Sequence, residues 1–508
     1  MTAVGQSTPI RPRPVFGPVL CLMLGRTLAF AATFFIPVVL ARVFDPSRFA
    51  TYKQLFLIHS TVYLIAQVGM ATSLYYFLPR APHSAGRYVA NAVMFLGVTG
   101  LLGLGALELA RPHLALWLNN SELAHYIRWI GLYLFLMMPS AALEIILIAR
   151  GQYMWASASY LLSDLARAAA SILPVLLFHQ LDGLLKGLVL VAFVRAVVAL
   201  CYFKLEFRRE FCLDISLLRT QLAYALPFAL SVLVEIVQGN LPQYVVAWVS
   251  SPATFAIFAV GCLSVPLVDF AASPTSDVMM VRMQESLSAG RAKEVLETWH
   301  ETTRKLALLF FPLAALVVIA AREIIVLLYT AKYSAAVPIF MVWSMMIPLA
   351  TLQVDGVLRV FARTRRLLIL NLMRLAIIAG LIQWSVAAFS MTGPVLVILL
   401  ATLAFKTVAL LSMRDLLQVR AHGLLPWRNL ATVAAAAAAA GGFALAVKVL
   451  LTISIFPLLC IVSAVYVAAY ALLVWHLNLL SAGERSALAD MVRKARGGIG
   501  SVLEYGKG

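Results

Sequence analysis

Charged residues are scarce in this sequence, and acidic residues are scarcer than basic ones. Only 12% of its 508 residues are charged, with 22 acidic against 40 basic side chains. Cysteine is equally sparse, because the five cysteines are scattered and show neither a disulfide framework nor metal-ligand spacing. Such a composition excludes a small disulfide-rich secreted protein and a thiolate metal centre.

Sequence motifs for catalysis and cofactor binding are missing as well. The chain has no phosphate-binding Gly-Lys-Ser/Thr loop, no His-Glu-x-x-His and no Gly-x-Ser-x-Gly. We therefore expect no ATPase of its own, no metal, no cofactor and no catalytic residue. If the apolar runs of this chain cross a membrane, the loops between them on the outer side are all short. Short outer loops disfavour a membrane glycosyltransferase or polymerase. The chain is expected to be a transporter and not an enzyme.

Apolar residues are abundant, at 62% of the chain, and they form long runs. A helix of about 20 apolar residues crosses a bilayer, and its backbone groups are satisfied internally. The expected fold is all-α: a polytopic membrane helix bundle of about 14 transmembrane helices. The expected spans are 16–41, 51–78, 88–110, 125–149, 154–178, 184–203, 218–248, 253–275, 306–329, 335–356, 367–390, 393–413, 429–450 and 454–480.

Lysine and arginine are distributed unevenly between alternate loops. With the N-terminus inside, about 26 basic residues fall in inside loops and about 8 in outside loops. Both termini are therefore expected to be cytoplasmic. The net charge of +18 follows from insertion and from attraction to anionic membrane lipids, so no nucleic-acid partner is needed.

Two stretches about 206 residues apart resemble each other. Ala41, Val43, Pro46, Phe49 and Ala50 match Ala247, Val249, Pro252, Phe255 and Ala256. An even number of helices between them predicts parallel repeats, that is, two six-helix lobes plus two extra C-terminal helices. The expected domains are residues 1–204, 205–413, 414–480 (the extra pair) and a basic cytoplasmic tail, 481–508. The alanine-rich run in the extra pair predicts close helix packing, or alternatively a groove for an acyl chain.

Several charges lie inside the expected spans, where they are costly and usually face a cavity or a partner. Arg26 has no carboxylate nearby in its own helix, so we interpret it as a cavity cation for an anionic group such as a diphosphate. The alternative for Arg26 is a structural pair with another helix. Arg374 and Lys406 are secondary candidates for phosphate contact, or they simply pair.

Three more sets of intramembrane charges have different predicted roles. Asp164 and Arg167 are three residues apart on one helix face, which predicts a structural ion pair. Glu235 precedes a polar stretch interrupted by Pro242, as in cavity-lining segments, and is the leading candidate for an ion or proton coupling site. Asp269 is the second coupling candidate, or it pairs with a neighbouring helix. The coupling ion would be Na⁺ or H⁺.

Several motifs resemble those of the polysaccharide exporters of the multidrug/oligosaccharidyl-lipid/polysaccharide superfamily, in particular the Wzx-type oligosaccharide flippases. The matching stretches are Phe44-Asp-Pro-Ser-Arg-Phe-Ala-Thr-Tyr52, Val68-Gly69, Phe77-Leu-Pro-Arg80, Ala223-Tyr-Ala-Leu-Pro227, Phe311-Pro312 and Ile324-Ile-Val-Leu-Leu-Tyr329. Relatives often have Gly where Ser47 and Phe49 stand here. A total of about 14 helices is similar to the lipid II flippase branch.

The resemblance implies a flippase in the bacterial inner membrane. Its substrate would be an undecaprenyl-diphosphate-linked oligosaccharide, moved to the periplasmic leaflet by alternating access for O-antigen, exopolysaccharide or capsule synthesis. Arg26 would face the diphosphate. Candidate partners are membrane lipids and the polysaccharide polymerase and chain-length regulator of the same pathway. The alternatives are a drug or cation antiporter on the same fold and a lipid II flippase.

Overall fold

The described part of the chain is helical throughout. The computed structural model describes residues 16–480 and 483–486, and within these ranges it contains helices, turns and no strand. The prediction of an all-α, polytopic membrane bundle is confirmed. Long apolar runs form helices because a helix satisfies the hydrogen bonds of its own backbone N–H and C=O groups. Lipid offers these groups no hydrogen-bond partners.

Fewer stretches of the described chain meet the length and hydropathy of a membrane span than the sequence predicts. Among the described residues, 10 stretches are long and apolar enough to cross a membrane, or up to 12 if each of two bent pairs is one span. Thr364–Leu417 is one of these stretches, although a 3₁₀ turn divides it into two helices. The expected total of about 14 therefore stays a prediction.

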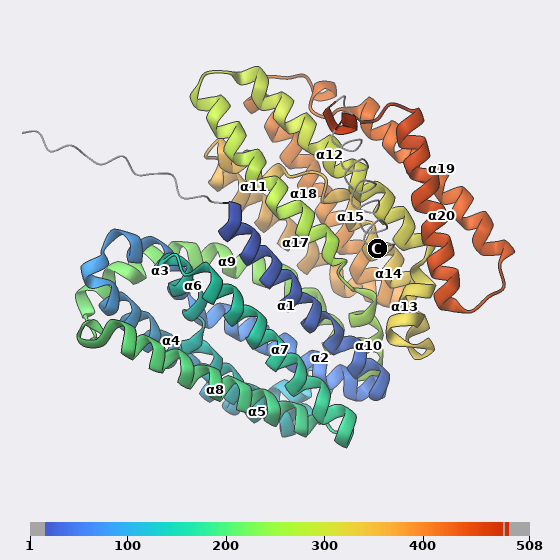
Figure 1. Ribbon diagram of the computed structural model, residues 1–508. Coiled ribbons are helices and arrows are strands. Elements are labelled where there is room, and N and C mark those ends of the chain that lie inside the picture. Colours follow the sequence, from blue (N-terminus) through green and yellow to red (C-terminus); the bar gives the residue numbers. More distant parts are fainter. Residues whose placement is uncertain (1–15, 481–482, 487–508) are drawn as a thin grey trace, which may run out of the picture. The chain divides into compact units, whose positions relative to one another are not determined.

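The chain packs into two compact units (Figure 1). Unit 1 is the chain up to Val260 together with Ile378–Pro394, and unit 2 is Gly261–Ile377 together with the chain from Val395 onward. The lobe boundaries expected from the repeat lie elsewhere, at 204/205 and 413/414, and remain a prediction about duplication. By packing, α9 and α10 belong with the preceding helices.

The helices of unit 1 are α1 (Phe16–Val43), α2 (Pro46–Gln67), α3 (Met70–Arg80), α4 (Ala85–Trp117), α5 (Leu123–Ser140), α6 (Leu143–Ala149), α7 (Tyr153–Phe178), α8 (Leu181–Phe207), α9 (Ile215–Val249) and α10 (Pro252–Gly261). The helices that follow are α11 (Pro266–Ser288), α12 (Ala292–Ile319), α13 (Ala321–Tyr329), α14 (Val337–Ser344), α15 (Met346–Leu349), α16 (Val354–Val360), α17 (Thr364–Phe389), α18 (Gly393–Leu417), α19 (Trp427–Leu450) and α20 (Ile455–His476). The 3₁₀ turns are η1 (Pro82–Ser84), η2 (Arg208–Glu210), η3 (Ala331–Ala336), η4 (Ser390–Thr392) and η5 (Ala421–Gly423).

Several spans are broken within their length. Between α2 and α3, Val68 and Gly69 adopt left-handed φ values of 48° and 66°, which interrupt the helical hydrogen bonding. The α10–α11 pair bends by 51°. Helix α9 bends by 50° between Pro227 and Val232 and continues as a helix through Pro242. The expected break at Pro242 is therefore wrong, because the bend occurs earlier, next to the first proline of α9.

The two repeated stretches form similar helix corners. Helix α1 ends at Val43 and α2 begins at Pro46, while α9 ends at Val249 and α10 begins at Pro252. Proline suits the first turn of a helix because the N–H it lacks has no intrahelical acceptor there. The matched prolines therefore start matched helices.

Capping and burial at these corners are also alike. The Asp45 carboxylate accepts hydrogen bonds from two backbone N–H groups of α2, and Ser251 Oγ accepts one from Thr254 N at 3.3 Å. The matched aromatic residues, Phe49 and Phe255, are both fully buried. The sequence likeness therefore extends to the local geometry of the two corners.

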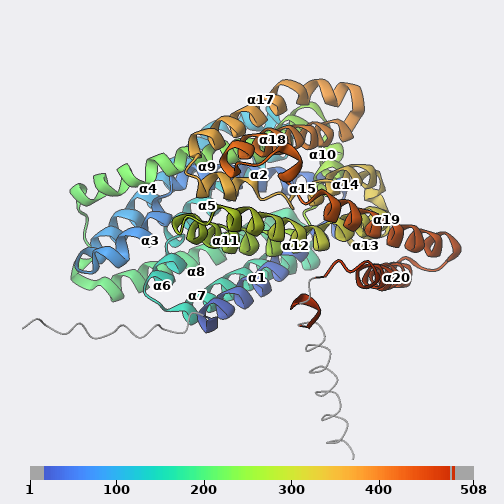
Figure 2. The same cartoon turned by 90° about the horizontal axis from the view of Figure 1, so that it is seen from above.

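The C-terminal helix pair packs closely within unit 2. Helices α19 and α20 lie side by side, and α19 also packs on α12 (Figure 2). The buried face of α19 is made of small residues, among them Ala436, Ala440 and Gly441. A Cβ atom added at Gly441 would lie 3.1 Å from Ile319 Cδ1, so the helices approach closely there. The small residues contribute to helix packing, as the sequence predicts.

Candidate functional site

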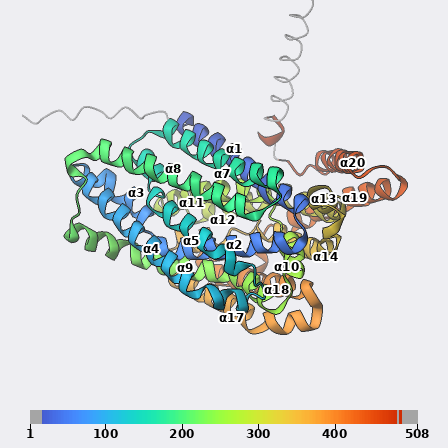
Figure 3. The ribbon, with the colours of Figure 1, turned by 90° about the horizontal axis from the view of Figure 1, so that it is seen from below.

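Arg26, the leading candidate for diphosphate contact, lies on α1. The backbone of α1 is helical there, but the Arg26 side chain lies outside the described residues. Helix α1 packs along α7, as Figures 1 and 3 show. The helix that carries Asp164 and Arg167 is therefore the neighbour of the helix that carries Arg26.

A buried ion pair between Glu144 and Arg195 lies at the centre of unit 1. Arg195 Nη2 donates to Glu144 Oε1 at 2.8 Å and to Oε2 at 2.9 Å. Their side chains are only 4% and 14% exposed. This pair links α6 to α8 across a sequence separation of 51 residues. Each charge would be costly in a span without the other.

Three serines form further hydrogen bonds with this pair. Ser159 Oγ donates to Glu144 Oε1 at 2.8 Å, and Arg195 Nε donates to Ser140 Oγ at 3.1 Å. Arg195 Nη1 also donates to Ser163 Oγ. Helices α5, α6, α7 and α8 thus meet in one hydrogen-bonded network.

Asp164 and Arg167 lie next to this network on α7. Arg167 Nη2 is 2.7 Å from Asp164 Oδ1. The Asp164 side chain is 26% exposed and the Arg167 side chain is 36% exposed. Asp164 is also within electrostatic range of Arg195 and Glu144. The Glu144–Arg195 pair is therefore enclosed, whereas the neighbouring Asp164–Arg167 pair is more open.

Three aromatic rings border the open pair. His59 on α2 stacks on Tyr63 at a centroid distance of 5.6 Å, and its ring centroid is 4.9 Å from that of Tyr133 on α5. His59 Nε2 is buried and has no hydrogen-bond partner among the described residues. Arg167 interacts electrostatically with His59. The imidazole adds one more titratable group to the polar interior of unit 1.

Glu235, the leading coupling candidate, lies on the bent helix α9. Its side chain is exposed, whereas Gln238 one turn later is buried. Further along α9, Asn240 Nδ2 donates to Thr61 Oγ1 at 2.8 Å, and Tyr244 Oη donates to the same oxygen at 3.0 Å. The polar stretch after Glu235 therefore ties α9 to α2, while Glu235 itself stands apart from the two ion pairs.

Lys406 and Arg374, the secondary phosphate candidates, lie together in unit 2. Lys406 Nζ donates to the Leu352 carbonyl at 2.8 Å and is 3.8 Å from Asp355 Oδ2. The carbonyl belongs to the break between α15 and α16, so Lys406 satisfies a backbone group that the break leaves without a helical donor. Arg374 is within electrostatic range of Lys406. Lys406, Arg374 and the Asp355 carboxylate therefore lie near one another.

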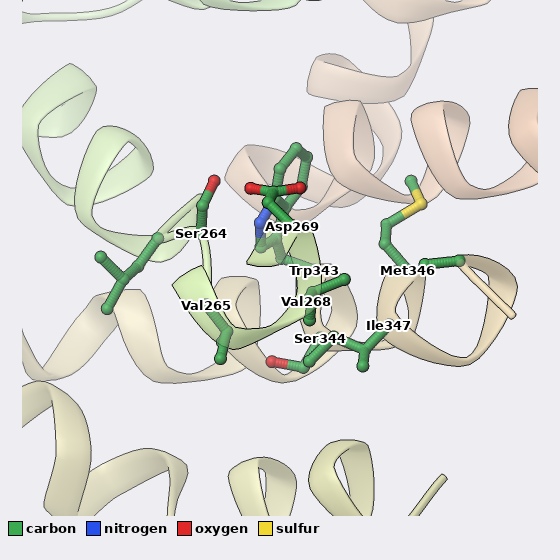
Figure 4. A pocket seen from close by; sticks show the side chains of 10 residues that line it. Ser264, Val265, Val268, Asp269, Trp343, Ser344, Met346 and Ile347 are labelled. Atoms are coloured by element: carbon green, nitrogen blue, oxygen red, sulfur yellow. The ribbon is translucent and has the colours of Figure 1, made fainter. Parts of the chain in front are cut away.

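Asp269, the second coupling candidate, lines a cavity of about 190 Å³ in unit 2. The cavity lies where the α10–α11 break meets α14 and α15, as Figure 4 shows. The polar groups in its lining come from Ser264, Asp269, Trp343 and Ser344. Carboxylate and hydroxyl oxygens together with carbonyls from an unwound segment are ligands suited to a small cation.

The described residues form no metal centre with three or more His, Cys, Asp or Glu ligands. Within residues 16–480 and 483–486, no group of three or more His, Cys, Asp or Glu side chains is arranged to hold a metal ion. The expectation of no metal concerns the whole chain and stays a prediction.

Sequence reasoning did not find two features of the site. These features are the pairing of Glu144 with Arg195, whose helices are not consecutive in the sequence, and the place of His59 beside Arg167. The signal that was available is chemical: both charges stand within apolar runs, where each requires a partner.

The profile of one protein family matches this chain. The profile of a family described as polysaccharide biosynthesis protein matches residues 39–338. The resemblance to polysaccharide exporters stated from the sequence is thereby confirmed at the level of the family. No curated protein matches this chain.

Solved structures show the same fold. The lipid II flippase MurJ, in an inward closed conformation, is 11% identical with a TM-score of 0.71 and covers 92% of this chain and 100% of its own. An inward-facing multidrug resistance MATE family transporter of the MOP superfamily is 13% identical with a TM-score of 0.64, covering 79% and 98%. A MOP superfamily transporter from Pyrococcus furiosus is 12% identical with a TM-score of 0.55, covering 79% and 95%. At these identities the likeness concerns the fold alone.

Proposed function

Because this chain belongs to the polysaccharide biosynthesis protein family, we propose that it is a flippase for a lipid-linked oligosaccharide. The substrate would be an undecaprenyl-diphosphate-linked repeat unit, carried from the cytoplasmic to the periplasmic leaflet of the inner membrane. The product would feed the synthesis of O-antigen, exopolysaccharide or capsule, together with the polymerase and chain-length regulator of that pathway. Both chain termini would be cytoplasmic.

The observation that carries this proposal is the placement of cations within helices of a transporter fold. Arg374 is within electrostatic range of Lys406 in unit 2, and α1 carries Arg26. A diphosphate and its sugars cannot cross hydrocarbon unaided, because each unsatisfied polar group there costs several kcal/mol. Guanidinium and ammonium groups replace the water that the diphosphate loses.

Transport would proceed by alternating access, with energy from an ion gradient. Asp269 is a candidate for the coupling site because its carboxylate lines a cavity at a helix break with Ser264 and Ser344. Glu235 is the other candidate, and either Na⁺ or H⁺ would suit a single carboxylate. The membrane potential supplies about 2.3 kcal/mol per charge for each 100 mV.

A drug or cation antiporter is the second candidate function. One observation favours it. The cavity that Asp269 lines has this carboxylate and no basic side chain in its lining. Such a cavity attracts a cation as its main cargo more readily than an anion.

Lipid analysis of a strain that lacks this protein would separate the candidates. We expect undecaprenyl-diphosphate oligosaccharide to accumulate on the inner leaflet, with sidedness probed in spheroplasts. No accumulation, combined with increased retention of cationic dyes, would favour the antiporter. Accumulation on the outer leaflet would place the defect after flipping and contradict the proposal.

A further inference from the structure

The Glu144–Arg195 pair (the enclosed pair) and the Asp164–Arg167 pair (the open pair) differ in how completely their charges are satisfied. In the enclosed pair, both oxygens of Glu144 accept hydrogen bonds from Arg195. In the open pair, one N–O contact of 2.7 Å joins Arg167 to Asp164. Arg167 Nε has no hydrogen-bond partner in the part of the chain that the structure describes. This Nε–H group is buried, and Arg167 also hydrogen-bonds to Tyr133, so the donor that Asp164 leaves unused is a buried N–H group.

The open side of this pair does not face lipid. Asp164 lies on the helical face of Ala168 and Ser171, four and seven residues later, and both of these residues are buried. A different face of α7 carries the exposed leucines Leu162 and Leu173. The partial exposure of Asp164 and Arg167 therefore belongs to the polar interior of unit 1, which suits a polar ligand.

We propose that Arg167 is an anion-binding residue whose resting partner is Asp164, and that the diphosphate of the transported lipid displaces the Asp164 carboxylate. This inference rests on the proposed flippase function and adds Arg167, on the helix beside the one that carries Arg26, to the residues proposed to bind the diphosphate. A guanidinium binds phosphate oxygens through a planar fork of donors, and Asp164 holds that fork in position when no substrate is bound.

Displacement leaves the Asp164 carboxylate without its nearest cation. The charged and titratable groups around it come from every neighbouring helix: His59 and Tyr63 on α2, Tyr133 on α5, Glu144 on α6, Arg167 on α7 itself and Arg195 on α8. Helix α1 adds Arg26, whose side chain lies outside the described residues. Arg195 remains within electrostatic range of Asp164, but its Nη2 group is hydrogen-bonded to both oxygens of Glu144.

A carboxylate in a span without a partner is neutralised most simply by a proton from water. Binding of the diphosphate would therefore take up a proton at Asp164, and affinity would fall as the pH rises. The exchange links cargo binding to protonation without a separate signal between distant sites.

Binding of inorganic diphosphate to the purified full-length protein, measured by calorimetry, tests this exchange. Arg167→Gln removes the fork and should weaken binding about tenfold or more. Asp164→Asn removes the competing carboxylate and should strengthen binding several-fold. Asp182→Asn, which breaks the Asp182–Lys186 pair in the first turns of α8 (28% and 55% exposed), is the matched control and should leave affinity unchanged.

The opposite signs of the two effects distinguish an exchangeable pair from a structural one. If Asp164→Asn weakens binding as much as Arg167→Gln does, the pair is structural and the inference is overturned. Arg167→Lys, which keeps the charge, should retain part of the affinity even if Arg167→Gln does not fold. Equal affinity in all variants also overturns the inference.

The pH dependence provides a second readout. Between about pH 6 and about pH 8, the affinity of the wild-type protein should fall relative to that of Asp164→Asn, whose own pH dependence reflects titration of the diphosphate and not of residue 164. Identical slopes would contradict proton uptake at Asp164. These binding measurements are independent of lipid accumulation in the deletion strain, so failure of the exchange and failure of the flippase function are distinguishable.

Discussion

Removal of either partner of the Glu144–Arg195 pair should destabilise unit 1 strongly. Glu144→Gln leaves the Arg195 guanidinium within a span with serine hydroxyls and an amide as partners. An uncompensated arginine at the centre of a span costs about 2.5–3.5 kcal/mol on insertion scales. Breaking a buried pair by removing one partner costs about 3–5 kcal/mol. Both routes give a loss of about 3 kcal/mol for Glu144→Gln, and a similar loss for Arg195→Gln.

The double variant Glu144→Gln, Arg195→Gln should recover most of this loss, because neither remaining group is charged. The free energies of unfolding can be measured in mixed micelles with a denaturing detergent, following helix content by circular dichroism. A double-mutant cycle then isolates the coupling between the two side chains. The Asp182–Lys186 pair, with Lys186 55% exposed, is the comparison. Its coupling should stay below about 1 kcal/mol.

A coupling free energy for Glu144 and Arg195 as small as that of the exposed pair would refute this reasoning. It would mean that water reaches the pair despite the 4% exposure of Glu144. Loss of transport without loss of stability in the single variants would be a different contradiction, because it would assign the pair to the transport step.

Three further predictions concern other parts of the chain. Arg26→Ala should leave the protein inserted but abolish polysaccharide export, and Arg26→Lys should keep part of the activity; normal export by Arg26→Ala at matched expression would contradict its role. Asp269→Asn should make flipping in proteoliposomes insensitive to an imposed ion gradient, whereas Ser264→Ala should only weaken that response; an unchanged gradient response in Asp269→Asn would exclude it as the coupling site. Gly441→Val should lower the midpoint of detergent-induced unfolding, because its Cβ atom would lie 3.1 Å from Ile319 Cδ1. Gly442→Val should not lower it, because a Cβ atom at Gly442 meets open space. Equal midpoints for the two variants would contradict close packing of α19.

The sequence could predict features that depend on local patterns. Long apolar runs predict the helices, and the match between Pro46 and Pro252 predicts two similar corners because proline position and capping are local properties. The Asp164–Arg167 contact is also local, since residues three apart share a helix face.

Features that depend on contacts between distant helices could not be predicted in the same way. The partner of Glu144 is 51 residues away, and several other intramembrane cations compete for it in the sequence. The position of a helix bend depends on which neighbours can satisfy the released backbone groups, so α9 bends near Pro227 and passes through Pro242 without a break. The cavity beside Asp269 requires two breaks, in different spans, to meet.

The pairing of Glu144 with Arg195 also has a consequence for the order of synthesis. A ribosome adds about 5–20 residues per second, so the 51 residues between these partners take roughly 3–10 s to make. During that interval α6 has left the ribosome and its acidic side chain has no arginine to bind. We therefore expect α6 to stay protonated at Glu144, or in contact with the insertion machinery, until α8 has been made. The yield of folded protein should then depend on the translation rate between these two helices.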